Sequence, residues 1–175
     1  MIRRILYDEA EIRAGVERVA GEIQARFHGE ELTMLVVLRG GIVFAADLVR
    51  RLELPLHLDT VGVSSYRGET MTPESVRIIS SPSLTLAGRT VLIVDDILDS
   101  GWTMSRLKEE ADRAGARSVS IAVLLDKPSR RQAPIRPDFA AFEVPDVWVV
   151  GYGLDYNERY RNLPYIAVYA EEGQS

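Results

Sequence analysis

Runs of consecutive apolar residues alternate with helical patterns along most of this chain. Residues 8–28 are predicted to form a helix, because Asp8 can cap it, Glu11 can reach back to the cap, and apolar residues recur at helical spacing. Further helices are predicted at 42–52 and 102–114, and strands at 33–38, 56–63, 76–80, 91–94, 119–125, 139–142, 147–150 and 166–169. This alternation predicts an α/β protein with a doubly wound, mainly parallel sheet flanked by helices.

The composition is typical of one compact domain. The chain has 175 residues, of which 46% are hydrophobic and 27% are charged, enough for a substantial core. The net charge of −5 argues against nucleic-acid binding, and the apolar run after Met1 is too short for a signal peptide or a membrane span. The chain has no cysteine, which excludes thiol catalysis, disulfides and zinc–thiolate sites. We expect a cytoplasmic protein that binds neither nucleic acid nor membrane.

A histidine metal site is not expected, because His28 and His57 lie on different predicted elements. A hard cation bound by carboxylates is the metal site that the residues allow. No dinucleotide-binding glycine motif and no Walker loop occurs in the sequence, so nucleotide binding of those kinds is excluded.

The most informative stretch is VLIVDDILDSGWTM, residues 91–104. Its four branched apolar residues lead into Asp95 and Asp96, and Asp99 follows three residues later. Ser100, Gly101 and Thr103 then form a turn that opens a helix, where backbone N–H groups can bind a phosphate monoester. An ordinary buried strand followed by a polar turn is the alternative interpretation.

This stretch resembles the signature of the type I phosphoribosyltransferases. The resemblance implies that Asp95 and Asp96 hold the ribose hydroxyls of phosphoribosyl pyrophosphate and that Asp99 acts as the catalytic base. It also implies that the 5′-phosphate binds to Ser100, Gly101, Trp102 and Thr103.

A glycine pair marks a second strand-to-helix turn, at Leu38-Arg39-Gly40-Gly41. Glycine pairs most often form ordinary tight turns, but this one matches the pyrophosphate loop in the hypoxanthine-guanine branch of the family. The resemblance implies that pyrophosphate is bound by Leu38, Arg39, Gly40, Arg131 and Arg161.

The polar segment 64–73 is longer than a hairpin needs, which fits either a surface connection or a lid that shields the reaction from water. Its Ser65-Tyr66 pair matches the loop that closes in the resembling enzymes.

The segment VVGYGLDYNERYRNLPYI, residues 149–166, is very similar to the C-terminal motif of the hypoxanthine-guanine phosphoribosyltransferases. The resemblance implies that Trp148 stacks on the purine, that Val149 bonds to it through its backbone, and that Lys127 donates to its 6-oxygen. Without the resemblance, Trp148 on an apolar strand is more typical of a core residue. Asp155 is implied to lie beside the purine and to bind Mg²⁺, for which Asp95 and Asp96 are further candidate ligands.

The resemblance implies purine salvage by a magnesium-dependent transferase. The 5-phosphoribosyl group of phosphoribosyl pyrophosphate would pass to hypoxanthine or guanine, giving IMP or GMP and pyrophosphate. The ammonium of Lys127 carries only donors, so it should favour a 6-oxopurine over adenine. The family also implies a homodimer or homotetramer and a single domain over residues 1–175, with a core at about 30–145 and a small hood formed by the N-terminal segment and residues 146–175.

Three positions depart from the commonest family pattern. Asp95 stands where glutamate is usual, Arg39 replaces a lysine of some members, and Trp102 is bulky for a phosphate loop. Three alternatives stay open: a xanthine-preferring enzyme, an RNA-binding pyrimidine-operon attenuator on the same scaffold, and a response-regulator receiver. The attenuator would need a basic face, and in a receiver the acid pair ends the first strand of the domain.

Overall fold

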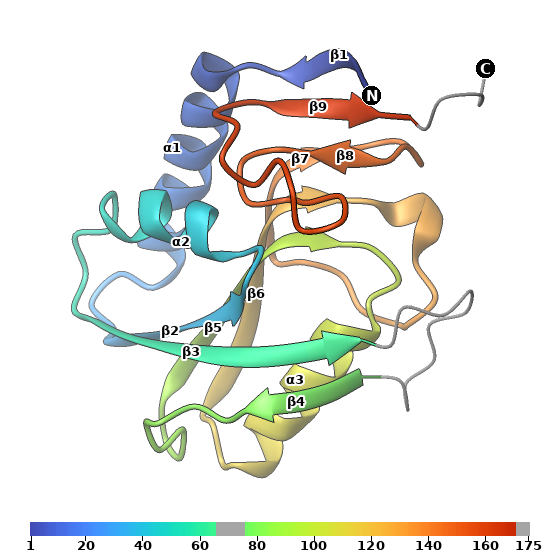
Figure 1. The fold of residues 1–175 in the computed structure, drawn as a ribbon. Helices are drawn as coiled ribbons and strands as arrows, with labels where there is room; N and C mark the ends of the chain where they lie inside the picture. The colour runs from blue at the N-terminus through green and yellow to red at the C-terminus, as the bar shows by residue number, and fades with distance from the viewer. Residues whose placement is uncertain (66–75, 171–175) are drawn as a thin grey trace.

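The computed structural model describes residues 1–65 and 76–170, and six of the strands it describes form one large sheet (Figure 1). Their order is β4, β3, β2, β5, β6, β7, and every neighbouring pair is parallel except β3 with β4. The predicted mainly parallel sheet is therefore confirmed. The strands span Leu32–Leu38 (β2), Leu56–Ser65 (β3), Val76–Ser80 (β4), Thr90–Leu98 (β5), Ser118–Asp126 (β6) and Phe139–Glu143 (β7).

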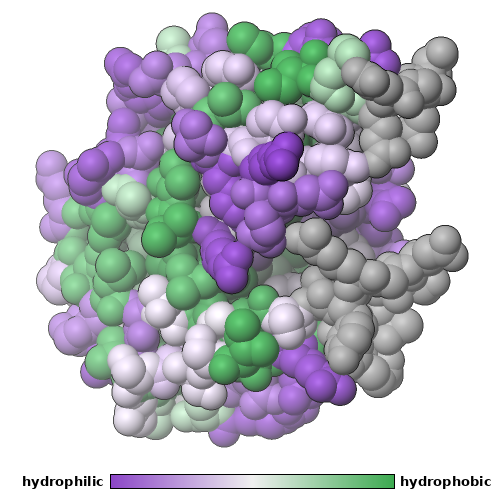
Figure 2. All heavy atoms as spheres, in the orientation of Figure 1, coloured by the Kyte–Doolittle hydropathy of each residue, from purple (hydrophilic) through white to green (hydrophobic). Residues whose placement is uncertain are grey.

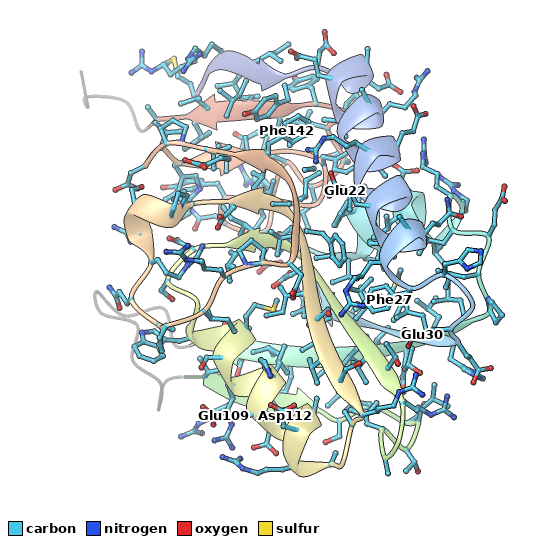
Figure 3. All side chains as sticks on the ribbon, turned by 180° about the vertical axis from the view of Figure 1, so that it is seen from behind. Glu22, Phe27, Glu30, Glu109, Asp112 and Phe142 are labelled. Carbon is cyan, nitrogen blue, oxygen red and sulfur yellow. The ribbon has the colours of Figure 1, made fainter. Side chains whose placement is uncertain are left out.

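Helices cover both faces of this sheet, as the doubly wound pattern predicts. They span Glu9–Arg26 (α1), Ile42–Val49 (α2) and Trp102–Arg113 (α3). Met34 and Leu92 pack with α1 and α2 on one face, and their chain neighbours Leu35 and Ile93 pack with α3 on the other. Successive strand residues point to opposite faces, so these strands are apolar at consecutive positions. Figure 3 shows α1 and α3 from behind, separated by the strands.

The first helix begins with the predicted capping box. The backbone N–H of Glu11 donates to Oδ1 of Asp8 at 2.9 Å, and the backbone N–H of Asp8 donates to Oε2 of Glu11 at 2.8 Å. A cap of this kind stabilises a helix by about 1 kcal/mol. Among the helices that the structure describes, none is long and apolar enough to span a membrane.

The two ends of the chain form a second, smaller sheet in the order β1, β9, β8 (Figure 1). Its strands are antiparallel, and their bounds are Ile2–Tyr7 (β1), Val149–Val150 (β8) and Ile166–Tyr169 (β9). The strand β1 was not among the predicted elements. Its first four residues are exposed, so the sequence carries no clear apolar pattern there, and its position is fixed by pairing with β9.

Two element ends differ from the prediction in ways that bear on the site. The strand β5 does not end before the acid pair: it continues through Asp95 and Asp96 to Leu98. Its ladder with β6 continues too, with Asp95 opposite Val123 and Leu98 opposite Asp126. The helix α2 ends at Val49 instead of residue 52.

Candidate active site

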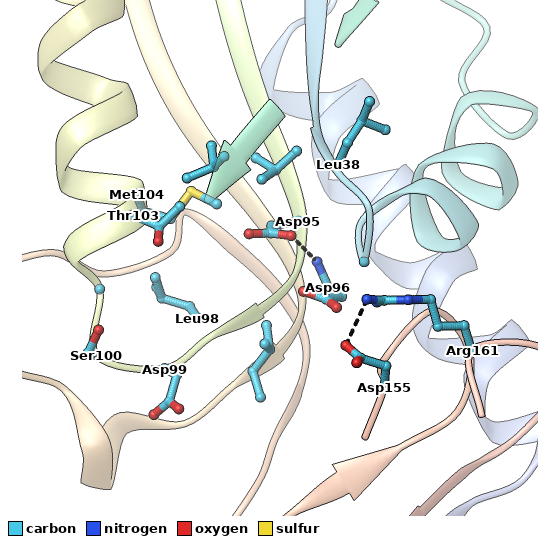
Figure 4. A pocket seen from close by; sticks show the side chains of 15 residues that line it. Leu38, Asp95, Asp96, Leu98, Asp99, Ser100, Thr103, Met104, Asp155 and Arg161 are labelled. Atoms are coloured by element: carbon cyan, nitrogen blue, oxygen red, sulfur yellow. Dashed lines mark hydrogen bonds and ion pairs between the residues drawn. The ribbon is translucent and has the colours of Figure 1, made fainter. Parts of the chain in front are cut away.

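A cleft of about 270 Å³ lies where the carboxyl ends of β2 and β5 meet the loop between β8 and β9. Figure 4 shows the acid pair at its centre, the turn before α3 on one side, and Asp155 with Arg161 on the other. The cleft also has apolar walls that the sequence did not single out, formed by Val37, Val63, Ile97, Leu98 and Met104. The predicted site residues in the lining are Leu38, Gly40, Asp95, Asp96, Asp99, Ser100, Gly101, Thr103, Asp155 and Arg161.

The acid pair is held at the end of β5 in a setting that favours protonation. Asp95 is buried, and its Oδ1 accepts the backbone N–H of Asp96 at 2.8 Å. Burial raises the pKa of the Asp95 carboxyl well above its ordinary value, and the neighbouring charge of Asp96 raises it further. Burial also raises the pKa of Asp96, although a hydrogen bond with Asp95, a backbone N–H and the charge of Arg161 oppose that shift. Hydroxyl donors or a cation would therefore stabilise the ionised pair.

The glycine loop, residues 38–41, approaches this pair so closely that two positions need glycine. A Cβ on Gly40 would lie 1.8 Å from Oδ2 of Asp96, and a Cβ on Gly41 would lie 2.8 Å from the carbonyl oxygen of Val37. The peptide bond between Leu38 and Arg39 is cis. The glycine pair is thus explained by close contact between this loop and β5, which a tight turn alone would not require.

The turn before α3 presents the amino end of that helix to the cleft. Gly101 adopts a left-handed conformation with φ of 89°, and its carbonyl oxygen accepts the backbone N–H of Ser105 at 2.9 Å. A Cβ on Gly101 would lie 2.8 Å from Cδ of Arg131, so a side chain is excluded by space as well as by conformation. Ser100 is buried, and Trp102 turns outward, where its Nε1 donates to Oε1 of Gln132 at 3.2 Å.

Asp99 lies between the acid pair and this turn. Its Oδ1 is buried and accepts no hydrogen bond from the residues that the structure describes, while Nε of Arg130 lies 3.5 Å away. A carboxylate that is held near an arginine and opens on the cleft suits a general base. The sequence interpretation missed Arg130, although the basic run at 130–131 was a signal for it.

Across the cleft, Asp155 and Arg161 form one ionic network with the glycine loop. Nη2 of Arg161 lies 2.8 Å from Oδ1 of Asp155, and Nη1 donates to the carbonyl oxygen of Gly153 at 2.7 Å. Nη1 of Arg39 lies 2.9 Å from Oε2 of Glu158, which also lies 3.6 Å from Arg161. Arg39 is not part of the cleft lining: its side chain is 75% exposed. Glu158 was not predicted, and its place within the C-terminal motif was the only signal.

Three of the four residues expected at the purine, Lys127, Trp148 and Val149, lie outside the cleft lining, and the fourth, Asp155, lies within it. Lys127 is buried, and its Nζ donates to the carbonyl oxygen of Val147 at 2.9 Å and lies 4.0 Å from Oδ1 of Asp146. The side chain of Trp148 is 58% exposed and meets Tyr156 edge-on, with 5.8 Å between the ring centroids. Trp148 is therefore not the core residue that an apolar strand would suggest. Val149 is buried in β8.

Arg131 does not lie where a pyrophosphate ligand is expected. It is absent from the cleft lining and only 12% exposed, and its guanidinium donates to the carbonyl oxygens of Leu98, Asp99 and Ile135 and pairs with Asp126. These acceptors occupy the N–H groups that a pyrophosphate would need. This geometry gives no support to the expected pyrophosphate contact of Arg131, which stays a prediction.

The expected lid falls mostly outside the structure's described ranges. Ser65 is the last residue of β3, and Tyr66 lies outside the described residues.

Three acidic residues were expected to bind magnesium. Over residues 1–65 and 76–170, no three His, Cys, Asp or Glu side chains gather into a metal cage. Asp95, Asp96 and Asp155 nevertheless offer hard oxygen ligands around one cleft. Mg²⁺ is commonly bound by one or two carboxylates together with substrate phosphates, so this donor set fits an ion that enters with a phosphorylated substrate.

Comparison with known proteins identifies the family. The sequence profile of the phosphoribosyl transferase domain matches residues 4–157. The chain belongs to the phosphoribosyltransferase family. Within it, the hypoxanthine-guanine phosphoribosyltransferase of Bacillus subtilis is 44% identical over 167 residues, which cover 95% of this chain and 93% of that protein. The hypoxanthine phosphoribosyltransferase of Salmonella typhimurium is 40% identical, covering 93% of this chain and 92% of that protein.

A solved phosphoribosyltransferase structure has the same fold. The crystal structure of a hypoxanthine-guanine phosphoribosyltransferase from Bacillus anthracis, with a HEPES molecule in its active site, superimposes with a TM-score of 0.93 at 36% identity. The match covers 97% of this chain and 100% of that one. The type I phosphoribosyltransferase fold implied by the sequence is therefore confirmed.

Proposed function

We propose that this phosphoribosyltransferase is a purine-salvage enzyme. It transfers the 5-phosphoribosyl group of phosphoribosyl pyrophosphate to hypoxanthine or guanine, releasing pyrophosphate and forming IMP or GMP. The observation that carries the proposal is the single cleft that gathers the acid pair, the turn before α3, the glycine loop and Arg161. The similarity to hypoxanthine-guanine phosphoribosyltransferases over nearly the whole chain supports the same activity.

The acid pair is assigned to the ribose. Asp95 and Asp96 accept hydrogen bonds from the 2′- and 3′-hydroxyls, which places negative charge beside a ring that becomes cationic as the pyrophosphate leaves. Ser100, Gly101 and Thr103, together with the backbone N–H of Trp102, bind the 5′-phosphate at the amino end of α3 and fix the orientation of the sugar.

Asp99 is assigned as the base that removes the proton from the purine nitrogen. The Asp99 side chain lines the cleft and is 40% exposed although its Oδ1 is buried, so the carboxylate offers a proton acceptor on the cleft side through its other oxygen. Nε of Arg130 lies 3.5 Å from that buried Oδ1.

The leaving group is assigned to the other side of the cleft. The backbone of Leu38 and Gly40, with Arg39 and Arg161, binds pyrophosphate, and Arg39 must then exchange its contact with Glu158 for one with phosphate. Asp155 and the acid pair would hold Mg²⁺ together with the substrate, and the bound cation would supply positive charge beside the pyrophosphate.

The purine is assigned to the surface between Lys127 and Trp148. The Lys127 ammonium has three donors and already points at the carbonyl oxygen of Val147, so a purine 6-oxygen can accept from the same group. Trp148 offers an exposed ring for stacking, and Val149 offers backbone groups to the base edge. Adenine would place a donor against a donor, which costs affinity.

The decisive experiment is a nucleotide-forming assay. The protein is incubated with phosphoribosyl pyrophosphate, Mg²⁺ and one of hypoxanthine, guanine, xanthine, adenine or uracil, and products are separated by chromatography. IMP and GMP are expected, and the absence of nucleotide from any 6-oxopurine would refute the proposal. A product from xanthine at a higher kcat/KM than from hypoxanthine would favour the xanthine-preferring alternative.

The proposal includes the arrangement of the chain. Residues 1–175 form one domain in which residues of about 30–145 are the core and the small sheet is a hood over the purine side. The helix α1 packs on β7 and α2 of the core, so we assign only β1 of the N-terminal segment to the hood. Ser65 and Tyr66 stay assigned to the lid.

A homodimer or homotetramer and a cytoplasmic location also belong to the proposal. Support for assembly comes from apolar side chains at the surface of α2, β3 and β4, where Ile42, Leu58 and Ile79 are exposed. Figure 2 shows such green patches over α2 and along β3. Light scattering after size-exclusion chromatography measures the assembly, and a monomeric mass would refute it.

A further inference from the structure

Arg131 has a role that neither the sequence nor the comparisons assign. We propose that it is a positioning residue: it fixes the loop of Asp99 and the 5′-phosphate turn against the segment that begins with Lys127. The inference rests on the proposed function, because it assigns Asp99 and the turn their tasks. It replaces the expected contact of Arg131 with pyrophosphate.

The guanidinium of Arg131 is directed at the backbone of the catalytic loop. Its Nε donates to the carbonyl oxygen of Asp99 at 2.9 Å, and its Nη2 donates to that of Leu98 at 3.0 Å. Its Nη1 donates to the carbonyl oxygen of Ile135 at 2.7 Å, within its own segment. One planar group therefore bridges two chain segments through three backbone acceptors.

The acceptors need such donors because of where β5 ends. The strand leaves the sheet after Leu98, so the carbonyls of residues 99 and 100 have no further ladder to pair with, and buried carbonyls need partners. The segment after β6 supplies them. The carbonyl oxygen of Leu98 also accepts the backbone N–H of Lys127 at 3.0 Å, and that of Ser100 accepts from Gln132 and Ala133 at 2.9 and 3.0 Å.

The same side chain closes its own segment. Nη2 of Arg131 pairs with Oδ1 of Asp126, the last residue of β6, and both side chains are largely buried. This contact spans the short helix Pro128–Arg130 and thereby holds Lys127 between two fixed points. The aliphatic part of Arg131 packs under the turn, because a Cβ on Gly101 would meet its Cδ at 2.8 Å.

Arg131 thus supports the base and the phosphate turn from behind. It is absent from the cleft lining and borders a different cavity together with Asp126, Pro134 and Arg136. Since the guanidinium fixes two successive backbone carbonyls, its loss should move the Asp99 carboxylate and the turn. A displacement of about 1 Å at reacting groups can lower a rate by roughly 100-fold.

The test compares Arg131→Lys and Arg131→Met with Arg136→Met, an exposed arginine five residues further along the chain. Lysine keeps the charge beside Asp126 but cannot reproduce the planar fork. For each variant, kcat per folded protein is measured with hypoxanthine and phosphoribosyl pyrophosphate. Dissociation constants for ribose 5-phosphate and for magnesium pyrophosphate are measured by titration calorimetry. Arg161→Lys serves as the reference for a lost pyrophosphate contact.

We expect Arg131→Lys to lower kcat at least 10-fold and to weaken the binding of ribose 5-phosphate at least 5-fold. The affinity for magnesium pyrophosphate should stay within 2-fold of that of the parent. Arg136→Met should match the parent, and Arg161→Lys should weaken pyrophosphate. Should Arg131→Met not fold, Asp126→Asn, which weakens the same clamp, should shift the same two quantities in the same direction.

Three results would overturn the inference. Loss of pyrophosphate affinity in Arg131→Lys would restore the ligand role, and unchanged kcat with unchanged ribose 5-phosphate affinity would leave only a structural role. A fall in kcat without a change in ribose 5-phosphate affinity would mean that Arg131 positions the loop of Asp99 but not the 5′-phosphate turn. A parent protein that forms no nucleotide would instead refute the proposed function, and this inference with it.

Discussion

Alanine substitutions at the two glycines of the glycine loop, Gly40 and Gly41, should have different consequences. At Gly40 the new Cβ would lie 1.8 Å from Oδ2 of Asp96 and 2.5 Å from its Cγ. These atoms lie at the end of a short side chain, and its rotation can move them by the distance of more than about 1 Å that an ordinary contact requires. At Gly41 the new Cβ would lie 2.8 Å from the carbonyl oxygen of Val37 and 3.0 Å from Cα of Asp95. Those are backbone atoms of two strands, which cannot yield without distorting the sheet.

The magnitudes follow from what has to move. In Gly40→Ala the carboxylate of Asp96 leaves its place at the ribose, so kcat/KM for phosphoribosyl pyrophosphate should fall about 100-fold, or about 2.7 kcal/mol. The free energy of unfolding should change by less than about 1 kcal/mol, because rotating a side chain toward the cleft is cheap. In Gly41→Ala the overlap with backbone should lower the free energy of unfolding by about 1–3 kcal/mol.

Initial rates and urea unfolding, measured on the same preparations, distinguish the two effects. Gly21→Ala is the matched control: no atom lies within 4 Å of its new Cβ, and alanine inside α1 should stabilise the protein by about 0.5–1 kcal/mol without altering rates. Near-parental activity in Gly40→Ala would refute the assignment of Asp96 to the substrate. A large loss of stability there would show that the loop, and not the carboxylate, yields.

Three further predictions concern other parts of the site. Lys127→Ala should narrow the ratio of kcat/KM between hypoxanthine and adenine at least 10-fold, and an unchanged ratio would disprove its role as purine reader. Asp95→Asn in magnesium-free buffer should raise the melting temperature at pH 7. The pKa of Asp95 is raised in the folded protein, so the fold favours the protonated carboxyl. The stability that this carboxyl contributes is therefore complete below the unfolded pKa of 3.8, and it is lost as the pH rises through the folded pKa and the buried group ionises. The gain in melting temperature should therefore vanish toward pH 3, and a gain that does not depend on pH would contradict the explanation by the raised pKa. Tyr152→Phe removes the hydroxyl that donates to Asp47 and should lower the free energy of unfolding by about 1 kcal/mol, measured by urea unfolding; no loss would mean that this contact contributes nothing.

Much of the large sheet could be predicted because its strands are buried on both faces. Such strands are apolar at consecutive positions, and β2 and β6 contain the predicted runs 33–38 and 119–125 and extend by one residue or a few beyond them. The strand β1 could not be predicted in this way. Its exposed residues include Arg3 and Arg4, and its partner β9 lies at the other end of the chain. Pairing over such a separation leaves no local pattern in the sequence.

The end of β5 shows where local propensity is overridden. Aspartate is depleted from strands, so the sequence favours an end before Asp95. The ladder with β6 instead continues to Leu98, because the partner strand is present and apolar opposite it. This longer strand keeps the acid pair within the sheet, near the carboxyl end of a central strand, where burial raises the pKa of both carboxyls. A property that matters for binding a cation or hydroxyls therefore depends on tertiary pairing.

Arg131 shows why the supporting residues of the site could not be predicted, although many lining residues could. An arginine in a basic run after a strand is consistent with a solvated surface or with an anion ligand, and the sequence cannot decide between them. The decision comes from backbone hydrogen bonds: where β5 leaves the sheet, the carbonyl of Asp99 needs a donor, and the guanidinium supplies it and adds a second donor to the carbonyl of Leu98. Residues that touch substrate follow a motif set by the substrate's chemistry. The residues that hold them in place depend on which backbone acceptors a particular fold leaves without a donor. Only the three-dimensional arrangement shows which acceptors these are.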